Sequence, residues 1–359
     1  MKKIKLMIVD DSVLFRSQIQ QALKDCPEIE VVALASNGKI AIEKLQTQEI
    51  DILTLDLEMP VLDGMGTLTE MKQLGLKQKV VLFSSQSRAG AIKTLEAMQV
   101  GATDFVAKPM PDASTLTPAE KIKQALYPKI TSLFPDLSTP AASAPVRSVT
   151  KASSIPVIWE AFRPEVLVIA SSTGGPNALT EFFSKMSAPV PYPILIAQHM
   201  PPVFTASLAE RIGKVCGKVA REAVHGEVLV PNQIYVAPGD FHMKLTGTKQ
   251  KPVISLDQGP QRNFVRPCAD HLFETATDIY GRNTLGIVFT GMGRDGATGA
   301  QYVKDKNGVI LIQSQETCVV FGMPGAVHEL GAYDYTGSPD QLAMKVCTIS
   351  KAKGGLNVA

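Results

Sequence analysis

The sequence predicts an α/β protein with two doubly wound parallel sheets, the second of which carries an inserted β-hairpin. In both halves of the chain, short apolar runs rich in β-branched residues alternate with segments of helical spacing, as in sheets buried under helices. Between the halves lies a stretch dominated by Pro, Ala, Ser and Thr, with little to bury. Since 359 residues suffice for two cores, we expect a first domain at 1–134, a flexible linker at 135–164, a second domain at 165–350 and a tail at 351–359.

Composition and charge exclude several classes of protein. The formal net charge of +2 gives no reason to expect nucleic acid or a membrane surface as a partner. No apolar run approaches the roughly 20 residues of a membrane-spanning helix, and the N-terminus enters a strand directly instead of forming a signal peptide. The cysteines are scattered without a CxxC pair, which indicates reduced thiols and no structural zinc. We therefore expect a cytoplasmic protein that neither inserts into a membrane nor binds nucleic acid.

In the first domain, five predicted strands alternate with five predicted helices. The strands are expected at 4–9, 30–35, 50–55, 80–84 and 103–107, and the helices at 13–24, 39–48, 66–73, 89–100 and 117–133. Five βα repeats predict a parallel sheet whose functional residues lie at the carboxyl ends of its strands.

Polar side chains stand at four of these strand ends: Asp10 and Asp11 after the first, Asp56 at the third, Ser84 and Ser85 at the fourth, and Lys108 at the fifth. Three converging carboxylates would repel one another and raise one another's pKa, whereas Mg²⁺ accepts oxygen ligands while keeping several waters. A carboxylate between Mg²⁺ and a lysine ammonium can accept a phosphoryl group, because both cations neutralise the transferred oxygens. A single strand-end acid would indicate only a solvated cap; the whole set favours a phosphoacceptor site.

This segment resembles the receiver domain of two-component signalling proteins, a flavodoxin-like fold. The resemblance rests on the strand-end set above, on the run that follows Asp56 as far as Gly64, and on the pair Lys108-Pro109, which the family usually joins by a cis bond. It implies that Asp56 is phosphorylated, and that Mg²⁺ is held by Asp10, Asp11, Asp56 and the backbone carbonyl of Glu58. It further implies the switch residues Ser85, with Ser84 as the alternative, Phe105 and Lys108.

The second domain again alternates strands with helices. Strands are expected at 166–170, 193–197, 217–222, 233–237, 243–246, 253–256, 285–290 and 308–313, and helices at 175–185, 202–212, 267–280 and 297–306. The pair Pro238-Gly239 suggests an antiparallel hairpin inserted at an edge. Before this domain, the apolar segment 155–159, with the only tryptophan, is expected to dock on a domain surface.

One strand-to-helix turn stands out as a candidate for chemistry. The run 166–170 ends in Ser171-Ser172-Thr173-Gly174-Gly175-Pro176, where a helix can begin. Such a turn raises a side chain above the sheet edge and leaves backbone N–H groups free beside it, which suits a nucleophilic serine with an oxyanion hole. On these residues alone, an ordinary turn whose serines cap a helix is an equal alternative.

Two further side chains follow parallel strands. His199 comes just after 193–197, and Asp295 follows 285–290, so both are expected at the same sheet edge as Ser172. Nucleophile, base and orienting acid form a hydrolase triad. The chain order Ser-His-Asp differs from that of the α/β-hydrolases and of the trypsin and subtilisin types, and the GxSxG elbow is absent, which disfavours those families. Each residue has another possible role: His199 could cap the helix at 202–212, Asp295 could be a helix N-cap, and four other histidines compete for the base, His225, His242, His271 and His328. Their spacing does not favour zinc.

Residues 166–347 resemble the catalytic domain of the CheB chemotaxis methylesterase family, a Rossmann-like domain that follows a receiver. The motifs that carry the resemblance are 171–176, Gln198-His199-Met200-Pro201, Tyr235-Val236-Ala237-Pro238-Gly239-Asp240, 291–296 and Phe321-Gly322-Met323-Pro324. It implies Ser172 as nucleophile, His199 as base, Asp295 as orienting acid, and the N–H groups of Met292 and Thr173 as the oxyanion hole. No cofactor is implied in this domain.

The resemblance also implies a substrate and a control. The substrates would be glutamate methyl esters, and some glutamines, on chemoreceptors, and the phosphodonor a chemotaxis histidine kinase. We expect the unphosphorylated receiver to block the Ser172 edge and phosphorylation of Asp56 to shift the population toward an open form.

The sequence departs from the family's usual pattern at two places. Ala170-Ser171 stands where Gly-Ala is common, and Cys268 where a serine is usual. Adjacent serines leave Ser171 as a rival nucleophile. Two other functions compete: a phosphorylation-switched adaptor with an inactive hydrolase scaffold, and a transcriptional regulator, which would need a basic recognition helix that the sequence does not show.

Overall fold

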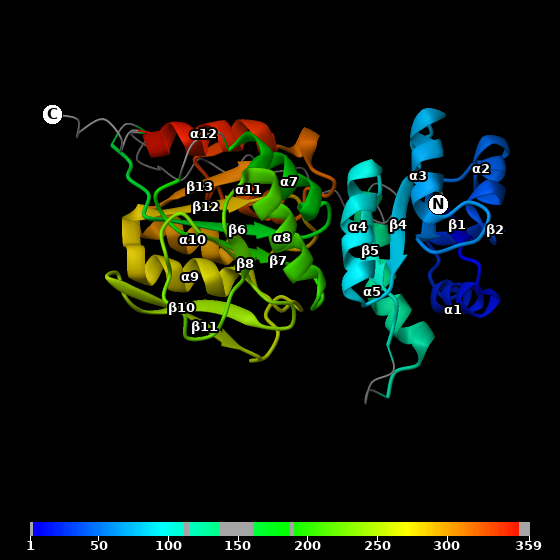
Figure 1. The fold of residues 1–359 in the computed structure, drawn as a ribbon, viewed down its shortest axis with the longest axis horizontal. Coiled ribbons are helices and arrows are strands. Elements are labelled where there is room, and N and C mark those ends of the chain that lie inside the picture. The colour runs from blue at the N-terminus through cyan, green and yellow to red at the C-terminus, as the bar shows by residue number, and fades with distance from the viewer. Residues whose placement is uncertain (1–2, 111–114, 136–158, 160, 187–189, 352–359) are drawn as a thin grey trace. The chain divides into compact units, whose positions relative to one another are not determined.

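The computed structural model describes residues 3–110, 115–135, 159, 161–186 and 190–351. The chain divides into two compact units, residues 1–143 and 144–359, each described by itself (Figure 1). Most of the predicted linker and the tail beyond 351 lie outside the described residues.

The first unit is a five-stranded parallel sheet with helices between the strands. Its strands are β1 (Ile4–Val9), β2 (Ile29–Ala35), β3 (Ile52–Asp56), β4 (Lys79–Ser84) and β5 (Asp104–Ala107), in the order β2-β1-β3-β4-β5. Its helices are α1 (Val13–Leu23), α2 (Gly38–Thr47), α3 (Gly64–Gln73), α4 (Arg88–Val100) and α5 (Pro118–Leu133). The interior strands β1, β3 and β4 are almost wholly buried, as their continuous apolar runs predicted.

The second unit is built on a seven-stranded sheet in which every pairing is parallel. The strands are β6 (Val166–Ser171), β7 (Ile194–Gln198), β8 (Ala220–Glu222), β9 (Ile234–Val236), β12 (Thr284–Val288), β13 (Val309–Gln313) and β14 (Tyr335–Gly337). Their order is β14-β13-β12-β6-β7-β9-β8. The chain leaves β6 toward β7 on one side and returns as β12 on the other, so the strand order reverses at β6. Ligands of open parallel sheets bind at such a reversal, beside the carboxyl ends of the strands.

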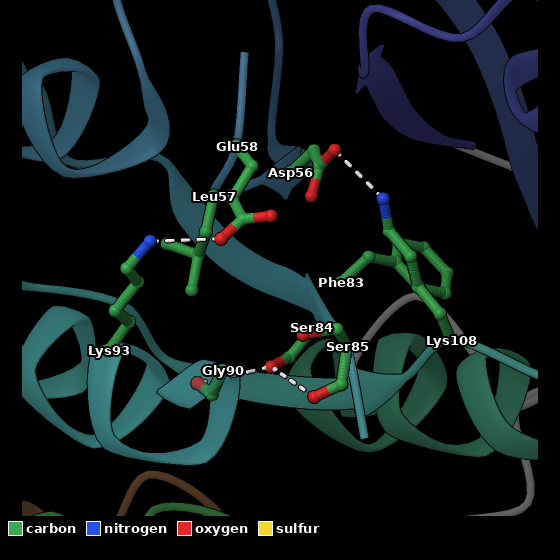
Figure 2. A pocket seen from close by; sticks show the side chains of 9 residues that line it. All are labelled: Asp56, Leu57, Glu58, Phe83, Ser84, Ser85, Gly90, Lys93 and Lys108. Atoms are coloured by element: carbon green, nitrogen blue, oxygen red, sulfur yellow. Dashed lines mark hydrogen bonds and ion pairs between the residues drawn. The ribbon is translucent and has the colours of Figure 1, made fainter. Parts of the chain in front are cut away.

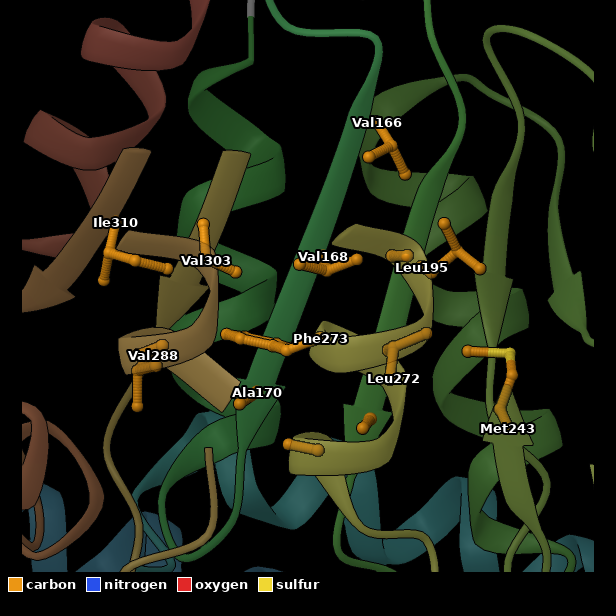
Figure 3. Close-up of a cluster of buried hydrophobic side chains, with 14 of the residues drawn as sticks. Val166, Val168, Ala170, Leu195, Met243, Leu272, Phe273, Val288, Val303 and Ile310 are labelled. Atoms are coloured by element: carbon orange, nitrogen blue, oxygen red, sulfur yellow. The ribbon is translucent and has the colours of Figure 1, made fainter. Parts of the chain in front are cut away.

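Helices cover both faces of this sheet. On one face, α7 (Gly175–Lys185) packs between α8 (Phe204–Cys216) and α12 (Pro339–Lys351). On the other, α9 (Ala269–Tyr280) packs between α10 (Ala297–Asp305) and the hairpin β10 (His242–Thr248) and β11 (Lys251–Asp257). Alternate residues of β6, Val166, Val168 and Ala170, point into the core beneath α9 (Figure 3). This packing fixes the position of the end of β6 relative to α9.

These observations confirm the predicted fold class and correct several details. The hairpin forms a two-stranded sheet of its own and turns at Lys249-Gln250, between the paired residues Thr248 and Lys251, whereas Pro238-Gly239 merely links β9 to β10. Three elements near the C-terminus were not predicted: α11 (Met323–Glu329), β14 and α12. Among the described residues the cis peptide bond is Arg266–Pro267, so the cis bond expected at Lys108–Pro109 is not observed.

Two further expectations concern the segment before the second unit and the absence of a membrane-spanning helix. Of the apolar segment 155–159, only Trp159 lies within the described residues; its ring stands edge-on to Tyr335 at 6.5 Å, with Lys345 Nζ 3.6 Å from its centre. Trp159 therefore packs against β14 and α12, whereas the rest of the segment lies outside the described residues and its docking stays a prediction. In the portion of the chain that the structure describes, no helix is long and apolar enough to cross a membrane.

Candidate active site

The turn after β6 holds Ser172 in a fixed position at the reversal of strand order. Its N–H donates to Thr290 O at 3.0 Å, and its carbonyl accepts from Gly175 N at 2.8 Å and Gln198 Nε2 at 2.9 Å. Gly174, with φ of +76°, makes the turn possible, because a Cβ there would lie 2.6 Å from Val319 Cγ2. The local sequence Ser-Thr-Gly-Gly thus builds a turn that neighbouring strands brace.

The two adjacent serines have different surroundings. Ser171 is fully buried, and its hydroxyl donates to Gln198 Oε1 at 2.6 Å. Ser172 keeps 8% of its surface exposed, and no hydrogen bond of its hydroxyl is found within the described part of the chain. The Ser171 hydroxyl is committed to a buried partner, whereas that of Ser172 is available, which favours Ser172 as the nucleophile.

His199 and Asp295 meet beside this turn, although 96 residues separate them in the chain. His199 Nε2 lies 2.7 Å from Asp295 Oδ2, and the His199 side chain is 11% exposed. The His199 N–H donates to Ser171 O at 3.1 Å, which ties the start of the loop after β7 to the end of β6. Because Nε2 is engaged by the carboxylate, Nδ1 is the nitrogen that remains for proton exchange.

Asp295 lies at the N-terminus of α9 and is surrounded by donors. Its carboxylate accepts hydrogen bonds from Ala269 N at 2.6 Å, Asp270 N at 3.2 Å, Cys268 Sγ at 2.9 Å and Asn263 Nδ2 at 3.1 Å. Burial opposes its charge, but the hydrogen bond to His199, the His199 charge and the other donors outweigh burial and hold the Asp295 pKa well below its usual range. The carboxylate is therefore ionised and fixed before any substrate arrives.

Helices α9 and α10 cap one another through two carboxylates. Asp295 precedes α10 yet accepts from the first backbone N–H groups of α9, and Asp270 in the first turn of α9 accepts from Gly299 N of α10 at 2.7 Å. Asn263 Nδ2 bridges the two acids. Asp295 thus caps a helix and contacts His199 at once, so its two predicted roles do not exclude each other.

Two backbone N–H groups beside Ser172 are without an acceptor. Those of Thr173 and Met292 donate to none of the described residues. The loop that carries Met292 presses against the nucleophile turn, since a Cβ on Gly291 would lie 2.7 Å from Ser172 Cβ. It is held there by Met323 N, which donates to Gly291 O at 2.8 Å. An oxyanion formed at Ser172 could accept from both free groups.

The other histidines have partners elsewhere in the second unit. His225 Nδ1 contacts the Leu256 backbone, His242 Nε2 contacts Pro260 O, the rings of His242 and His271 meet edge-on, and His328 stacks on Tyr333. Helix α8 begins after Val203 without a side-chain cap, so His199 does not cap it.

In the first unit, the acids and the lysine also converge. Lys108 Nζ lies 2.8 Å from Asp56 Oδ2 and 3.4 Å from Asp10 Oδ2 (Figure 2 shows the former pair). Carboxylate oxygens of Asp10, Asp11 and Asp56 all lie within 4.8 Å of one another. Burial raises the pKa of Asp10, and the charge of Asp56 adds to this while Lys108 opposes it. One ammonium facing three carboxylates leaves an excess of negative charge, which a cation would neutralise.

The remaining receiver residues surround this edge. Glu58 turns its side chain to Lys93 at 2.9 Å, and its backbone carbonyl accepts no hydrogen bond from the described residues (Figure 2). Ser84 is buried and hydrogen-bonded to Thr94 at 2.6 Å, whereas Ser85 is exposed with its hydroxyl 3.1 Å from that of Ser87. Both serines line the pocket beside Asp56, so the choice of switch hydroxyl stays open. Phe105 is buried on β5.

Comparison with known proteins finds a family match in each unit. The family model described as CheB methylesterase matches residues 167–346, and the one described as response regulator receiver domain matches residues 6–119. A Caulobacter vibrioides protein named protein-glutamate methylesterase/protein-glutamine glutaminase 2 is 39% identical over 352 residues, which cover 97% of this chain and 99% of that protein. This chain belongs to the CheB methylesterase family.

Other members of the CheB family give the same result. A Bdellovibrio bacteriovorus protein named protein-glutamate methylesterase/protein-glutamine glutaminase is 38% identical, with 95% of this chain and 96% of that protein covered. The crystal structure of the Thermotoga maritima CheB methylesterase catalytic domain is 40% identical, with a TM-score of 0.50, and covers 52% of this chain and 98% of that one. The predicted resemblance is therefore confirmed.

Several residues that shape this CheB site were not predicted as such. Gln198 joins β7 to the turn at Ser172, and Cys268, Asn263 and the N–H of Asp270 surround the carboxylate of Asp295. Gln198 carried a signal, because a buried glutamine beside the candidate base needs polar partners. Asn263 carried none, since asparagine in a polar loop is ordinary.

Cys268 is expected to support Asp295 as a hydrogen-bond donor. Burial and the charge of Asp295 raise the pKa of this thiol, so it stays protonated and donates. Replacing it with alanine removes one donor and should lower the rate at which a fluorophosphonate labels Ser172 by up to about tenfold. Cys268→Ser keeps a donor and should restore the rate; an alanine variant as fast as the wild type would show that the thiol only fills space.

Proposed function

We propose that this chain hydrolyses glutamate methyl esters, and the side-chain amides of some glutamines, on chemoreceptors, with Ser172, His199 and Asp295 as its catalytic triad. The observation that carries the proposal is the 2.7 Å contact of His199 with the ionised carboxylate of Asp295, beside the turn after β6, in which Ser172 is the serine whose hydroxyl has no partner among the described residues. Membership of the CheB family supports the reaction, and the names of the Caulobacter and Bdellovibrio relatives support both substrates.

The proposed reaction follows from these positions. Ser172 Oγ attacks the ester carbonyl while His199 takes its proton, and Asp295 stabilises the imidazolium that forms. The carbonyl oxygen becomes an oxyanion, for which the N–H groups of Thr173 and Met292 are the donors at hand. The tetrahedral intermediate collapses as His199 returns the proton to the leaving methoxide, which releases methanol. Water then attacks the acyl-enzyme by the same proton route and leaves a glutamate carboxylate; a glutamine would release ammonia instead.

The decisive measurement is methanol release from a methylated chemoreceptor. We expect the purified full chain to release methanol, and a fluorophosphonate to label Ser172 and stop the release. An adaptor with an inactive scaffold would bind the receptor without releasing methanol and would resist the reagent. Such a result would refute the proposed activity.

The first unit is proposed to receive a phosphoryl group on Asp56 from a chemotaxis histidine kinase. Its acidic edge fits Mg²⁺, because three carboxylates there lie within 4.8 Å of one another and one lysine cannot neutralise them. Asp10, Asp11, Asp56 and the carbonyl of Glu58 would hold the ion, which when bound offsets charge on the transferred oxygens. Lys108 Nζ, already 2.8 Å from Asp56, would pair with the phosphoryl group once it is attached.

Phosphorylation at Asp56 is expected to raise the methylesterase activity. Asp56→Ala should leave basal methanol release unchanged and abolish the stimulation that acetyl phosphate with Mg²⁺ gives the wild type, because the acceptor oxygen is gone. Glu43→Ala, which removes an exposed acid on α2, serves as the matched control and should respond like the wild type. Stimulation of the Asp56 variant would contradict the proposed regulation.

The setting that we propose is the cytoplasm. All five cysteines are free thiols, as expected in a reducing compartment. The kinase and the modified segments of the receptors would have to be accessible there.

A further inference from the structure

A tight turn beside the triad acid holds its two central residues in the left-handed region. Asn263 has φ of +56° and Phe264 of +62°, and the flanking residues pair, with Val265 N donating to Arg262 O at 3.1 Å. Two consecutive positive φ values describe the type I′ turn of a hairpin. Asparagine tolerates this region, but a bulky aromatic residue such as Phe264 is rarely found there.

Hydrogen bonds join the turn at Asn263 and Phe264 to Asp295 and to the residues around it. Asn263 Nδ2 donates to Asp270 Oδ2 at 2.9 Å and to Asp295 Oδ1 at 3.1 Å. On one flank, Arg262 forms two hydrogen bonds of 2.7 Å with Glu274 of α9. On the other, Arg266 binds Asp240 Oδ1 at 2.6 Å and Gly259 O at 2.7 Å. The backbone at Phe264 is therefore held in place although its side chain contributes nothing to the packing.

Phe264 points away from all of this. Its side chain is 95% exposed, the highest value for any large apolar residue in the described part of the chain. Neither the strained backbone of Phe264 nor its solvated ring stabilises the folded state. Backbone strain that the fold does not need is typical of functional positions. A rigid aromatic side chain loses little conformational entropy on binding, which suits it to anchor a partner.

Two other exposed apolar residues lie near the predicted site, Val203 on the loop that carries His199 and Val319 on the loop before α11. Val203, with φ of +74°, follows His199 by four residues, and Val319 lies over Gly174 in the nucleophile turn. Each is 36% exposed. We call Val203, Phe264 and Val319 the apolar rim. Ser172 itself is only 8% exposed, so a glutamate side chain of a protein substrate would reach it while the rest of that substrate stays outside the site.

We propose that Phe264 is the anchor of the apolar rim, against which the protein substrate packs an apolar side chain neighbouring the ester-bearing glutamate. This inference rests on the proposed function and adds to it a residue that determines how tightly the protein substrate is held. The contact lies outside the reacting atoms, so it lowers KM for the protein substrate and leaves the chemistry at Ser172 unaffected.

The test compares a protein substrate with a small probe on the same full-length variants. For Phe264→Ala we expect KM for a methylated receptor fragment to rise about tenfold or more, with kcat unchanged. The rate at which a small fluorophosphonate labels Ser172 should not change. Phe264→Gly removes the same ring but suits the left-handed backbone better, so it should raise KM equally while the turn stays intact.

Control variants separate the ring from general surface effects. Phe264→Tyr retains the ring and should keep KM near the wild-type value. Val219→Ala removes an exposed apolar side chain that precedes β8, at the amino edge of the sheet, and should change nothing.

Three results would overturn the inference. Equal losses with the receptor fragment and the small probe would mean that the turn acts through Asn263 on Asp295. Faster labelling of the unphosphorylated Phe264→Ala variant would assign the ring to a contact that restrains the enzyme. An unchanged KM would show that no anchor exists. If the wild type releases no methanol from the fragment while Ser172 is labelled normally, the proposed function fails and not the anchor alone.

Discussion

Replacing Ser172 with alanine is expected to lower the rate of methanol release from methylated receptors by about 10⁶-fold, by analogy with serine hydrolases whose triad acts as a unit. The alanine leaves no nucleophile at the reversal of strand order, and the Ser171 hydroxyl cannot substitute because it is buried and bound to Gln198 Oε1 at 2.6 Å. Release is measured with the full chain in the presence of a phosphodonor.

Ser171→Ala is the matched control for this loss. It removes a buried hydrogen bond and should cost about 1 to 3 kcal/mol of the free energy of unfolding, with Gln198 Oε1 left unsatisfied. Its activity should stay within about tenfold of the wild type, since Gln198 Nε2 still holds the carbonyl of Ser172. If Ser171→Ala were the inactive variant and Ser172→Ala the active one, the assignment of the nucleophile would be reversed.

Asp295→Asn is expected to lower kcat by about 10⁴-fold, the loss seen when the acid of a serine-protease triad becomes an amide. Both oxygens of Asp295 accept from donors, so an amide NH₂ in either orientation faces an N–H or S–H group. With the NH₂ group in the place of Oδ2, a donor would face both His199 and the Ala269 N–H and would select the wrong tautomer of His199. The same variant should unfold at a lower temperature, because α9 loses the charge at its N-terminus.

The stability that Asp295 contributes depends on pH. Since the pKa of Asp295 in the folded protein is depressed, its ionised form adds stability above the pKa of an unfolded aspartate, and that stability is lost as the pH falls toward the folded value. The difference in unfolding free energy between wild type and Asp295→Asn should therefore shrink in acid. Thermal unfolding at neutral and acidic pH measures it.

Asp270→Asn provides the comparison that separates stability from catalysis. Asp270 caps α10 through Gly299 N but is not hydrogen-bonded to His199, so its amide variant should lose stability and keep most of the activity. Should Asp270→Asn prove as inactive as Asp295→Asn, loosening of the helix pair, and not the orientation of His199, would explain both losses.

Much of this could be predicted from the sequence because the signals are local. Buried parallel strands are continuous apolar runs, and their carboxyl ends meet at one edge, which was enough to bring Asp10, Asp56 and Lys108 together. The same reasoning placed His199 and Asp295 at one edge, where the structure finds them in contact. Their catalytic roles remain predictions.

What could not be predicted depends on partners distant in the sequence. The exchange of caps between α9 and α10 joins residues 25 to 29 positions apart, and no local pattern distinguishes a carboxylate that caps its own helix from one that caps a neighbour. Strand β14 has three residues and only Gly337 is buried, so it lacks a strand pattern altogether. The two hairpin strands were predicted inside β10 and β11, but Pro238-Gly239 was the turn signal that suggested the hairpin, whereas its actual turn, Lys249-Gln250, contains neither proline nor glycine.

The caps that α9 and α10 share affect the order in which this enzyme would lose its active-site residues in evolution. The Ser172 hydroxyl has no hydrogen bond to lose among the described residues, whereas losing Asp295 uncaps a core helix. A gene copy released from selection for hydrolysis should therefore lose Ser172 first and retain Asp295 for much longer. In such a descendant, an aspartate at position 295 would show that the helix cap is still needed, and would not be evidence of hydrolase activity.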